Sequence, residues 1–178
     1  LPCNNKLESG VCTALVFACY LTRLPSRPVL DMNKMLTAFQ QFFREHSESW
    51  VERFDYKEAG PQLLMQAFLQ RIINGGGQVH REYGQGRKRT DLLVVWPLED
   101  DMATSVAQRV VIELKILHKS LDTTLKEGLK QTWDYMDRGN AKEGHLIIFD
   151  RSADKSWEEK IWKRVEVYEG KTIHVWGM

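Results

Sequence analysis

The sequence predicts an α/β fold in which helices flank a mixed central β-sheet. Apolar residues recur at helical spacing up to about residue 73, and beyond that point the spacing becomes that of strands. Three successive strands are joined by short polar links, which favours antiparallel pairing. A helical segment then separates the third strand from a fourth, which favours a crossover to a parallel neighbour.

Two helices are predicted ahead of the strands. The first spans residues 31–46, where Asp31 suits the N-cap position. Its apolar residues fall on one face, namely Met32, Met35, Leu36, Phe39, Phe42 and Phe43. The second helix begins near Pro61, because proline is favoured in the first turn of a helix, and ends at the glycine run of residues 75–77.

The strands are predicted over residues 79–83, 91–96 and 109–116, which are rich in valine and isoleucine. The link over residues 97–107 is acidic and predicts a solvent-exposed hairpin loop. A helix over residues 121–138 follows, and then a buried strand over residues 144–149. That helix has one apolar face, made of Leu125, Leu129, Trp133 and Met136. The tail predicts a hairpin that leads into a last strand over residues 172–176.

The length of 178 residues fits one domain with an extension. Residues 31–178 are assigned to the domain, and residues 1–30 to an N-terminal helical extension of unclear role. The formal net charge is +1, so the molecule as a whole has no basic field that would attract nucleic acid. Any affinity for nucleic acid would therefore come from a local patch.

The three cysteines, Cys3, Cys12 and Cys19, support neither a disulfide framework nor a zinc site, because no partner follows at ligand spacing. A reducing cytoplasm is therefore the expected compartment. The apolar run over residues 11–21 is too short to cross a bilayer, so no membrane association is expected. A signal peptide is disfavoured, since only Lys6 precedes the run and no small-x-small cleavage site follows it.

Glu113 and Lys115 are two charged residues within an otherwise apolar predicted strand. Strand alternation places them on one face, and Ile112, Leu114 and Ile116 on the other. Charges in a core strand cost free energy unless they are paired or bound to something. Asp91 opens the preceding strand, and a hairpin can bring it beside Glu113.

Two carboxylates that converge repel each other, and a divalent cation with oxygen ligands resolves the repulsion. The backbone carbonyl of Leu114 would add a further oxygen. Phosphodiester hydrolysis needs Mg²⁺, or Mn²⁺ in its place, to neutralise developing charge, and a nearby lysine such as Lys115 to orient or deprotonate water. The alternative left open by these residues is a structural Glu113–Lys115 ion pair, with Asp91 as a turn residue.

The segment over residues 86–93, Gly-Arg-Lys-Arg-Thr-Asp-Leu-Leu, followed by Val-Ile-Glu-Leu-Lys at 111–115, resembles the signature of the PD-(D/E)XK nuclease superfamily. More narrowly, residues 37–178 resemble nuclease-like C-terminal domains of prokaryotic AAA-type ATP-binding proteins. The stretches over 68–77, 127–132, 135–138, 144–151 and 175–178 carry this resemblance. Thr90 stands where the motif name has proline, and the chain has no Walker motif, so the ATPase part is lacking.

The resemblance implies a restriction-endonuclease-like sandwich with a catalytic site on its sheet. It assigns Asp91 and Glu113 as metal ligands and Lys115 as the catalytic lysine. Gln131 matches a recurrent glutamine that faces this site, and Tyr135 lies one helical turn further on the same face. An acidic residue on the first helix often completes the site, for which Glu58 is the candidate and Glu82 the alternative.

A basic cluster lies beside the predicted site. Arg87, Lys88 and Arg89 precede Asp91, and Lys119 follows the core strand. Such residues are typical of a phosphate-binding rim, but a solvated hairpin turn would carry the same charges. His118 is interpreted as a partly exposed structural histidine rather than a phosphate contact, and His145 as structural.

The predicted function is that of a Mg²⁺-dependent nuclease acting on DNA. The alternative is a catalytically silent nuclease-like module that binds nucleic acid or regulates an ATPase partner. A homodimer is a further expectation, since many members of the superfamily act as dimers. DNA and an ATPase domain or protein are therefore the expected partners.

Overall fold

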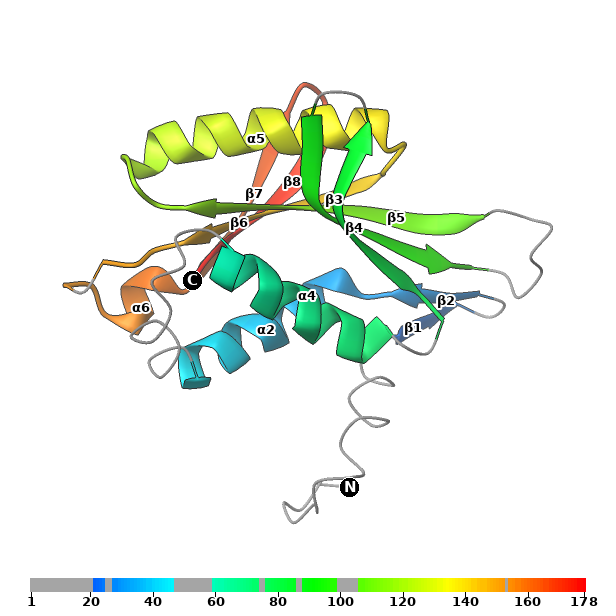
Figure 1. Ribbon diagram of the computed structural model, residues 1–178, viewed down its shortest axis with the longest axis horizontal. Coiled ribbons are helices and arrows are strands. Elements are labelled where there is room, and N and C mark those ends of the chain that lie inside the picture. Colours follow the sequence, from blue (N-terminus) through cyan, green and yellow to red (C-terminus); the bar gives the residue numbers. More distant parts are fainter. Residues whose placement is uncertain are drawn as a thin grey trace, which may run out of the picture.

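The computed structural model describes residues 21–24, 27–46, 59–73, 76–85, 88–98, 106–152 and 154–178. For residues 21–28, 59, 72 and 82–90 within these ranges it describes the backbone alone. Six strands form one mixed sheet, which is covered by helix α5 (Leu121–Arg138) on one face. Helices α2 (Met32–His46) and α4 (Ala59–Ile73) lie on the opposite side (Figure 1). This arrangement confirms the predicted α/β fold with a mixed sheet flanked by helices.

The strand order in the sheet is β3-β4-β5-β6-β8-β7. The strands are β3 (Gln78–Gln85), β4 (Lys88–Pro97), β5 (Ala107–Ile116), β6 (Glu143–Phe149), β7 (Trp162–Tyr168) and β8 (Lys171–Gly177). β3, β4 and β5 form an antiparallel meander, and β6 lies parallel to β5 after the crossover through α5. Both pairings are the ones predicted from the links between the strands.

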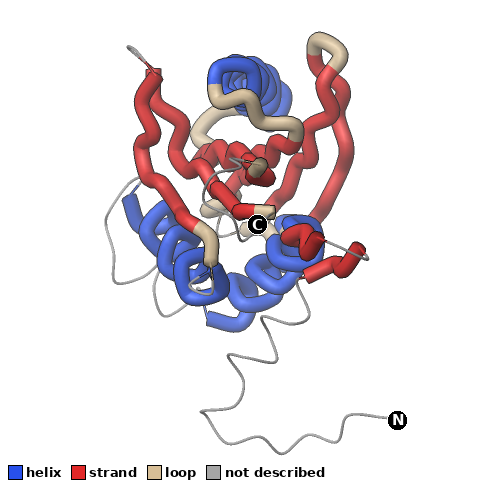
Figure 2. The backbone as a smooth tube through the Cα atoms, turned by 90° about the vertical axis from the view of Figure 1, so that its right-hand side faces the viewer, coloured by secondary structure: helices blue, strands red, loops and turns tan. Residues whose placement is uncertain are grey.

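The sheet curls around α5. Seen end-on, the β3–β4 and β7–β8 hairpins rise on either side of this helix, while α2 and α4 lie beneath the sheet (Figure 2). The sheet is strongly twisted, as expected for strands built from L-residues. The concave face that results holds α5 and the residues of the candidate site.

Two apolar clusters, one on each face of the sheet, hold the helices in place. The α5 face contains Leu93, Val111, Leu129, Met136, Ala141, Leu146, Ile148, Ile173 and Val175. The α2 and α4 face contains residues such as Phe39, Leu69, Leu92, Ile112, Phe149 and Trp176. Alternate residues of β4 and β5 therefore enter opposite clusters, which is the period-two pattern of a sheet buried on both faces.

The helix ends agree with their sequence signals. The Asp31 side chain accepts a hydrogen bond from the Lys34 backbone N–H at 3.0 Å, as an N-cap residue does. In α4, Pro61 is the third residue, and the predicted start there is two residues late. Gly76 and Gly77 donate their N–H groups to the carbonyl of Ile73, which ends α4.

The expectation of a helical N-terminal extension is wrong for the part that the structure describes. β1 (Leu21–Leu24) and β2 (Arg27–Leu30) form an antiparallel two-stranded sheet there. Pro25 and Pro28 explain the difference, because proline breaks a helix interior and is tolerated at turns and on edge strands. Residues 1–20 lie outside the described residues.

Residue 30 joins the extension to the main core. Leu30 is buried in the cluster beneath the sheet. Its backbone N–H donates to Gln108 Oε1, and its carbonyl accepts from Gln108 Nε2, both at 2.9 Å. None of the helices that the structure describes is both long enough and apolar enough to span a membrane.

α5 approaches β6 so closely that a glycine is required at residue 128. A Cβ atom built on Gly128 would lie 2.6 Å from Leu146 Cδ1, and Leu146 is fully buried. We therefore expect Gly128→Ala to destabilise the protein by about 1–3 kcal/mol, because α5 must move away from the sheet. Urea unfolding measures this change.

Gly60→Ala is the matched control for this substitution, because a Cβ atom there meets nothing within 4 Å. It should leave the free energy of unfolding unchanged or raise it by up to about 1 kcal/mol, since alanine is the better helix former. Equal effects of the two substitutions would contradict close packing at Gly128.

Candidate functional site

The pairing of β4 with β5 places Asp91 beside Glu113. In the register of the two strands Leu92 is opposite Ile112, and Asp91 and Glu113 are the next residue on each strand. Asp91 Oδ2 accepts a hydrogen bond from the Leu114 backbone N–H at 2.8 Å. The two carboxylates thus come from neighbouring strands, and the Asp91 side chain is fixed by the backbone of β5.

Glu113 is a buried carboxylate with one side-chain partner. Its side chain is 4% exposed, and Oε1 accepts a hydrogen bond from Lys115 Nζ at 2.8 Å. Oε2 is buried and has no hydrogen-bond partner among the described residues. An unpaired buried carboxylate oxygen costs free energy, so Oε2 of Glu113 is the atom in this site that a bound cation would stabilise.

The pKa of Glu113 is raised from 4.5 to about 7, mainly by burial and in second place by the nearby charge of Asp91. The ammonium group of Lys115 lowers this pKa but does not offset burial. A carboxyl pKa raised by burial and by a second carboxylate is typical of functional sites, although a carboxyl group buried in a core for structural reasons shows it too.

α5 contributes a polar stripe that runs past the two carboxylates. Thr124, Glu127, Gln131 and Tyr135 recur at intervals of three and four residues, so they share one side of the helix. Burial raises the pKa of the Tyr135 phenol, and the charges of Glu113 and Asp91 raise it as well, which places Tyr135 near both carboxylates. Oε1 of Gln131 is buried without a hydrogen-bond partner among the described residues.

Gln62, on the first turns of α4, is a member of the site that the sequence did not suggest. Its Nε2 donates to the Asp91 carbonyl oxygen at 3.4 Å and to Asp91 Oδ1 at 3.5 Å, which are long contacts. The only signal in the sequence is its place directly after Pro61, at the start of the helix expected to supply a ligand. Glu58, the predicted ligand, lies outside the described residues.

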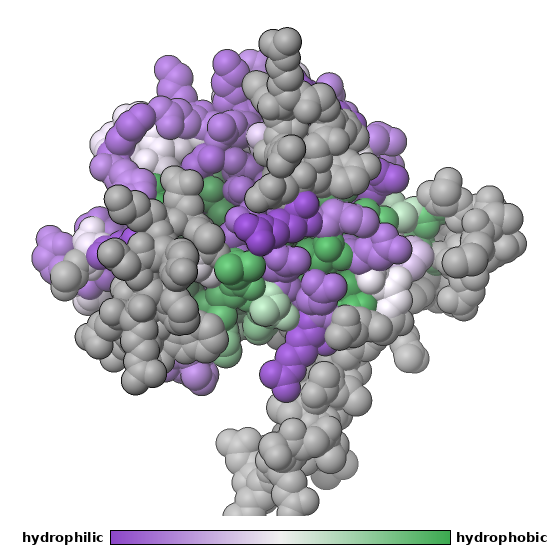
Figure 3. All heavy atoms as spheres, in the orientation of Figure 1, coloured by the Kyte–Doolittle hydropathy of each residue, from purple (hydrophilic) through white to green (hydrophobic). Residues whose placement is uncertain are grey.

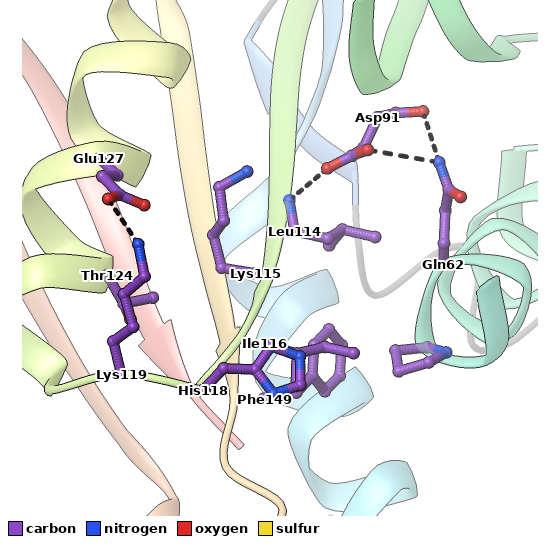
Figure 4. A pocket seen from close by; sticks show the side chains of 11 residues that line it. Gln62, Asp91, Leu114, Lys115, Ile116, His118, Lys119, Thr124, Glu127 and Phe149 are labelled. Atoms are coloured by element: carbon purple, nitrogen blue, oxygen red, sulfur yellow. Dashed lines mark hydrogen bonds and ion pairs between the residues drawn. The ribbon is translucent and has the colours of Figure 1, made fainter. Parts of the chain in front are cut away.

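A pocket lies next to Asp91, between α4, β5 and the start of α5 (Figure 4). Asp91, Lys115 and Gln62 line its polar part, together with Lys119 and Glu127. Its remaining lining residues are Pro61, Leu114, Ile116, His118, Thr124 and Phe149. The candidate site is therefore open to a ligand on the side of Asp91.

The predicted basic rim is described only in part. Lys119 is exposed at the pocket and pairs with Glu127 at 3.2 Å, so its charge is partly offset. Lys88 and Arg89 belong to β4, where they pair with Gln85 and Gly84, but their side chains are not described. Arg87 and the side chain of Glu82 also lie outside what the structure describes.

The donor set fits a hard divalent cation. Asp91 and Glu113 supply carboxylate oxygens, and the Leu114 carbonyl points to the side of Asp91, since its N–H does so. The unpartnered Glu113 Oε2 is the atom that such an ion would satisfy. Within the described part of the chain, however, no three or more His, Cys, Asp or Glu residues group to hold a metal ion.

A second polar cluster, beneath the sheet, is structural. His145 is fully buried, its Nε2 lies 3.0 Å from Glu143 Oε1, and its Nδ1 accepts the indole N–H of Trp176 at 3.1 Å. Because an indole N–H only donates, Nδ1 must be the unprotonated nitrogen and Nε2–H donates to Glu143. Both ring nitrogens are therefore satisfied, as the interpretation of His145 as a structural residue requires.

Comparisons with known proteins do not assign the chain to a family. No protein-family model, no curated protein and no solved structure matches it. The functional argument therefore depends on the residues of the site: two adjacent carboxylates, a lysine that contacts one of them, and a pocket that reaches the other.

Proposed function

We propose that this chain is a metal-dependent nuclease domain of the PD-(D/E)XK superfamily that hydrolyses phosphodiester bonds in DNA. The observation that carries the proposal is the adjacency of Asp91 and Glu113, with Lys115 on Glu113 and one buried carboxylate oxygen left without a partner. The mixed sheet between α5 and the α2–α4 layer is compatible with a restriction-endonuclease-like sandwich. The resemblance of residues 86–93 and 111–115 to the PD-(D/E)XK signature supports the choice of superfamily.

Asp91, Glu113 and the Leu114 carbonyl would hold Mg²⁺, or Mn²⁺ in its place. When bound, the ion would neutralise the charge that develops on the phosphate and would lower the pKa of a bound water. Asp91 is oriented for this role by the Leu114 N–H, and Glu113 is ionised once its second oxygen has a cationic partner.

Lys115 is the residue that orients the attacking water, and its positive charge favours loss of the water's proton to solvent. Its ammonium group donates to Glu113 and is about one-quarter exposed, so it lies between the buried carboxylate and the pocket. Gln131, whose buried amide oxygen lacks a partner, accepts a hydrogen bond from this water or from the substrate. Tyr135, on the same side of α5, contacts the nucleic acid.

Metal binding tests this function before any substrate is chosen. In a calorimetric titration with Mn²⁺, Asp91→Asn should weaken binding about tenfold or more, because it removes a charged ligand. The control is Asp150→Asn, since Asp150 lies outside the site and is held by Ser152 and Lys155. Wild-type protein that neither binds Mn²⁺ nor cuts DNA or RNA would refute the proposal.

A second candidate function is a silent nuclease-like module that binds nucleic acid or an ATPase partner. The Glu113–Lys115 ion pair and the Asp91–Leu114 hydrogen bond favour it, because each gives a carboxylate a partner from within the protein. Such a module would retain nucleic-acid binding, while Asp91→Asn and Glu113→Gln would leave any Mn²⁺ affinity unchanged. Cytoplasmic location and a homodimer are further expectations for either function.

A further inference from the structure

The pocket beside Asp91 is more apolar than a site for a phosphate and a metal ion alone requires. Four of its lining residues are apolar: Leu114 lies beside Asp91, Ile116 and Phe149 lie farther from it (Figure 4), and Pro61 is the fourth. Its cavity volume is about 280 Å³. Pockets for small ligands span roughly 300–1,000 Å³, so this pocket is close to the lower end of that range and suits one small planar group.

β5 turns backbone groups toward this pocket. The described pairing with β4 ends at Leu92–Ile112, and the Leu114 N–H points to the same side, to Asp91. The Leu117 N–H points the other way, to the Phe149 carbonyl on β6. Because backbone groups alternate along a strand, the N–H and carbonyl of Ile116 face the side of the pocket.

Polar side chains border the apolar part of the pocket. Gln62 comes from α4, while His118 follows β5 and is exposed. In Figure 4, Ile116, His118 and Phe149 lie together at one end of the pocket, and Asp91 and Gln62 lie at the other. Figure 3 shows that one face of the molecule exposes apolar surface between hydrophilic side chains.

We propose that this pocket receives one unpaired nucleobase of the nucleic acid whose backbone is handled at Asp91, Glu113 and Lys115. The proposal rests on the proposed nuclease function and specifies its substrate class. A base offers an apolar face that packs on aliphatic and aromatic side chains, and an edge of hydrogen-bond donors and acceptors. The pocket offers both complements: the apolar floor and the backbone groups of Ile116.

An unpaired base implies a single-stranded substrate. A base inside a continuous duplex is paired and stacked, and leaving the stack costs free energy. Single strands and frayed or overhanging duplex ends avoid this cost. The site should therefore act on these substrates in preference to the interior of a duplex.

The binding test uses single-stranded DNA and RNA oligonucleotides in which one nucleotide at a time lacks its base. Binding to the full chain is measured by fluorescence anisotropy in EDTA, so that no strand is cut. One abasic position should weaken binding roughly tenfold, the size expected for loss of one base–side chain stacking contact. The DNA and RNA series together show which sugar the site accepts.

Ile116→Gln tests whether the pocket is responsible, because it places a polar group on the apolar floor. It should abolish the difference between the sensitive abasic position and its neighbours. The matched control is Val165→Gln on β7, the same type of change on an exposed strand residue that does not line the pocket. If Ile116→Gln fails to fold, His118→Ala, an exposed change at the same pocket, replaces it.

The possible outcomes distinguish the proposal of a base-binding pocket from the proposed nuclease function. Metal-dependent cleavage that Asp91→Asn abolishes, together with equal binding of all abasic strands, overturns the base pocket and leaves the nuclease standing. Position-dependent binding without metal affinity or cleavage supports the pocket and overturns the nuclease. Preferential cutting of intact duplex interiors, or no binding of any strand, overturns the base pocket as well.

Discussion

Replacing Lys115 with alanine should lower metal-stimulated cleavage about 100-fold or more while the protein stays folded. A positioned charged donor that stabilises the transition state contributes roughly 10²–10³-fold to a rate, and Lys115 is the described lysine that contacts the buried carboxylate. Initial rates on a labelled oligonucleotide in Mn²⁺ measure the effect. The affinity for Mn²⁺ should change little, because the carboxylates remain.

Lys171→Ala is the matched control for this experiment. Lys171 is also a partly buried strand lysine in an ion pair, with Asp137 at 3.0 Å, and it lies over the Trp133 ring. It should keep full cleavage activity. Unchanged cleavage by Lys115→Ala would exclude Lys115 from the reaction, and Lys115→Arg tests whether positive charge alone is sufficient.

Glu113→Gln should stabilise the protein at pH 8 and remove a pH dependence of stability. The pKa of Glu113 is about 7 in the folded protein and 4.5, the ordinary value, in the unfolded chain, so folding favours the protonated form of Glu113. The contribution of Glu113 to the free energy of unfolding is fully present below pH 4.5, and it is lost as the pH rises through about 7. The shift corresponds to about 3 kcal/mol between these limits.

Urea unfolding of wild type and Glu113→Gln at several pH values measures the difference. The difference should be greatest above pH 7 and smallest near pH 4.5. Comparing the two proteins also removes the effect of His174, whose pKa is lowered by burial and by His145 and which acts in the opposite direction. For His174 the stability falls as the pH falls below about 6.5.

Mn²⁺ binding should release a proton near pH 6, because Glu113 must ionise to become a ligand. Calorimetry in two buffers of different ionisation enthalpy counts this proton. A release of about one proton in wild type and none in Glu113→Gln is the expected result. Equal release by both proteins would show that Glu113 does not ligate the ion.

Glu143→Gln should change the pH dependence of stability in the opposite direction to Glu113→Gln. The pKa of Glu143 is lowered in spite of its burial, because His145 and Gln108 hydrogen-bond to it. Its contribution to stability is therefore present at neutral pH and lost as the pH falls through its folded pKa. Glu113 is buried and Glu143 is partly buried on the opposite face of the sheet, and the two should change stability with pH in opposite directions.

Much of the architecture followed from local patterns in the sequence. Strand alternation assigned Glu113 and Lys115 to one face of β5, and the polar link over residues 97–107 predicted their antiparallel partner β4, which carries Asp91. The prediction of a helical extension was wrong at residues 21–30. Prolines there and a long-range contact with Gln108 outweighed any helical tendency, and an isolated segment does not reveal such a contact.

The sequence by itself determined the sheet, the order of its strands from β3 to β6, and the pairing of a carboxylate on β4 with one on β5. Only the tertiary structure decided what surrounds them. Gln62 reaches Asp91 from a helix distant in the chain, and the packing of α5 buries Glu113 deeply enough to raise its pKa to about 7. Burial and long-range contacts depend on how layers pack, whereas alternation and turn chemistry are properties of neighbouring residues.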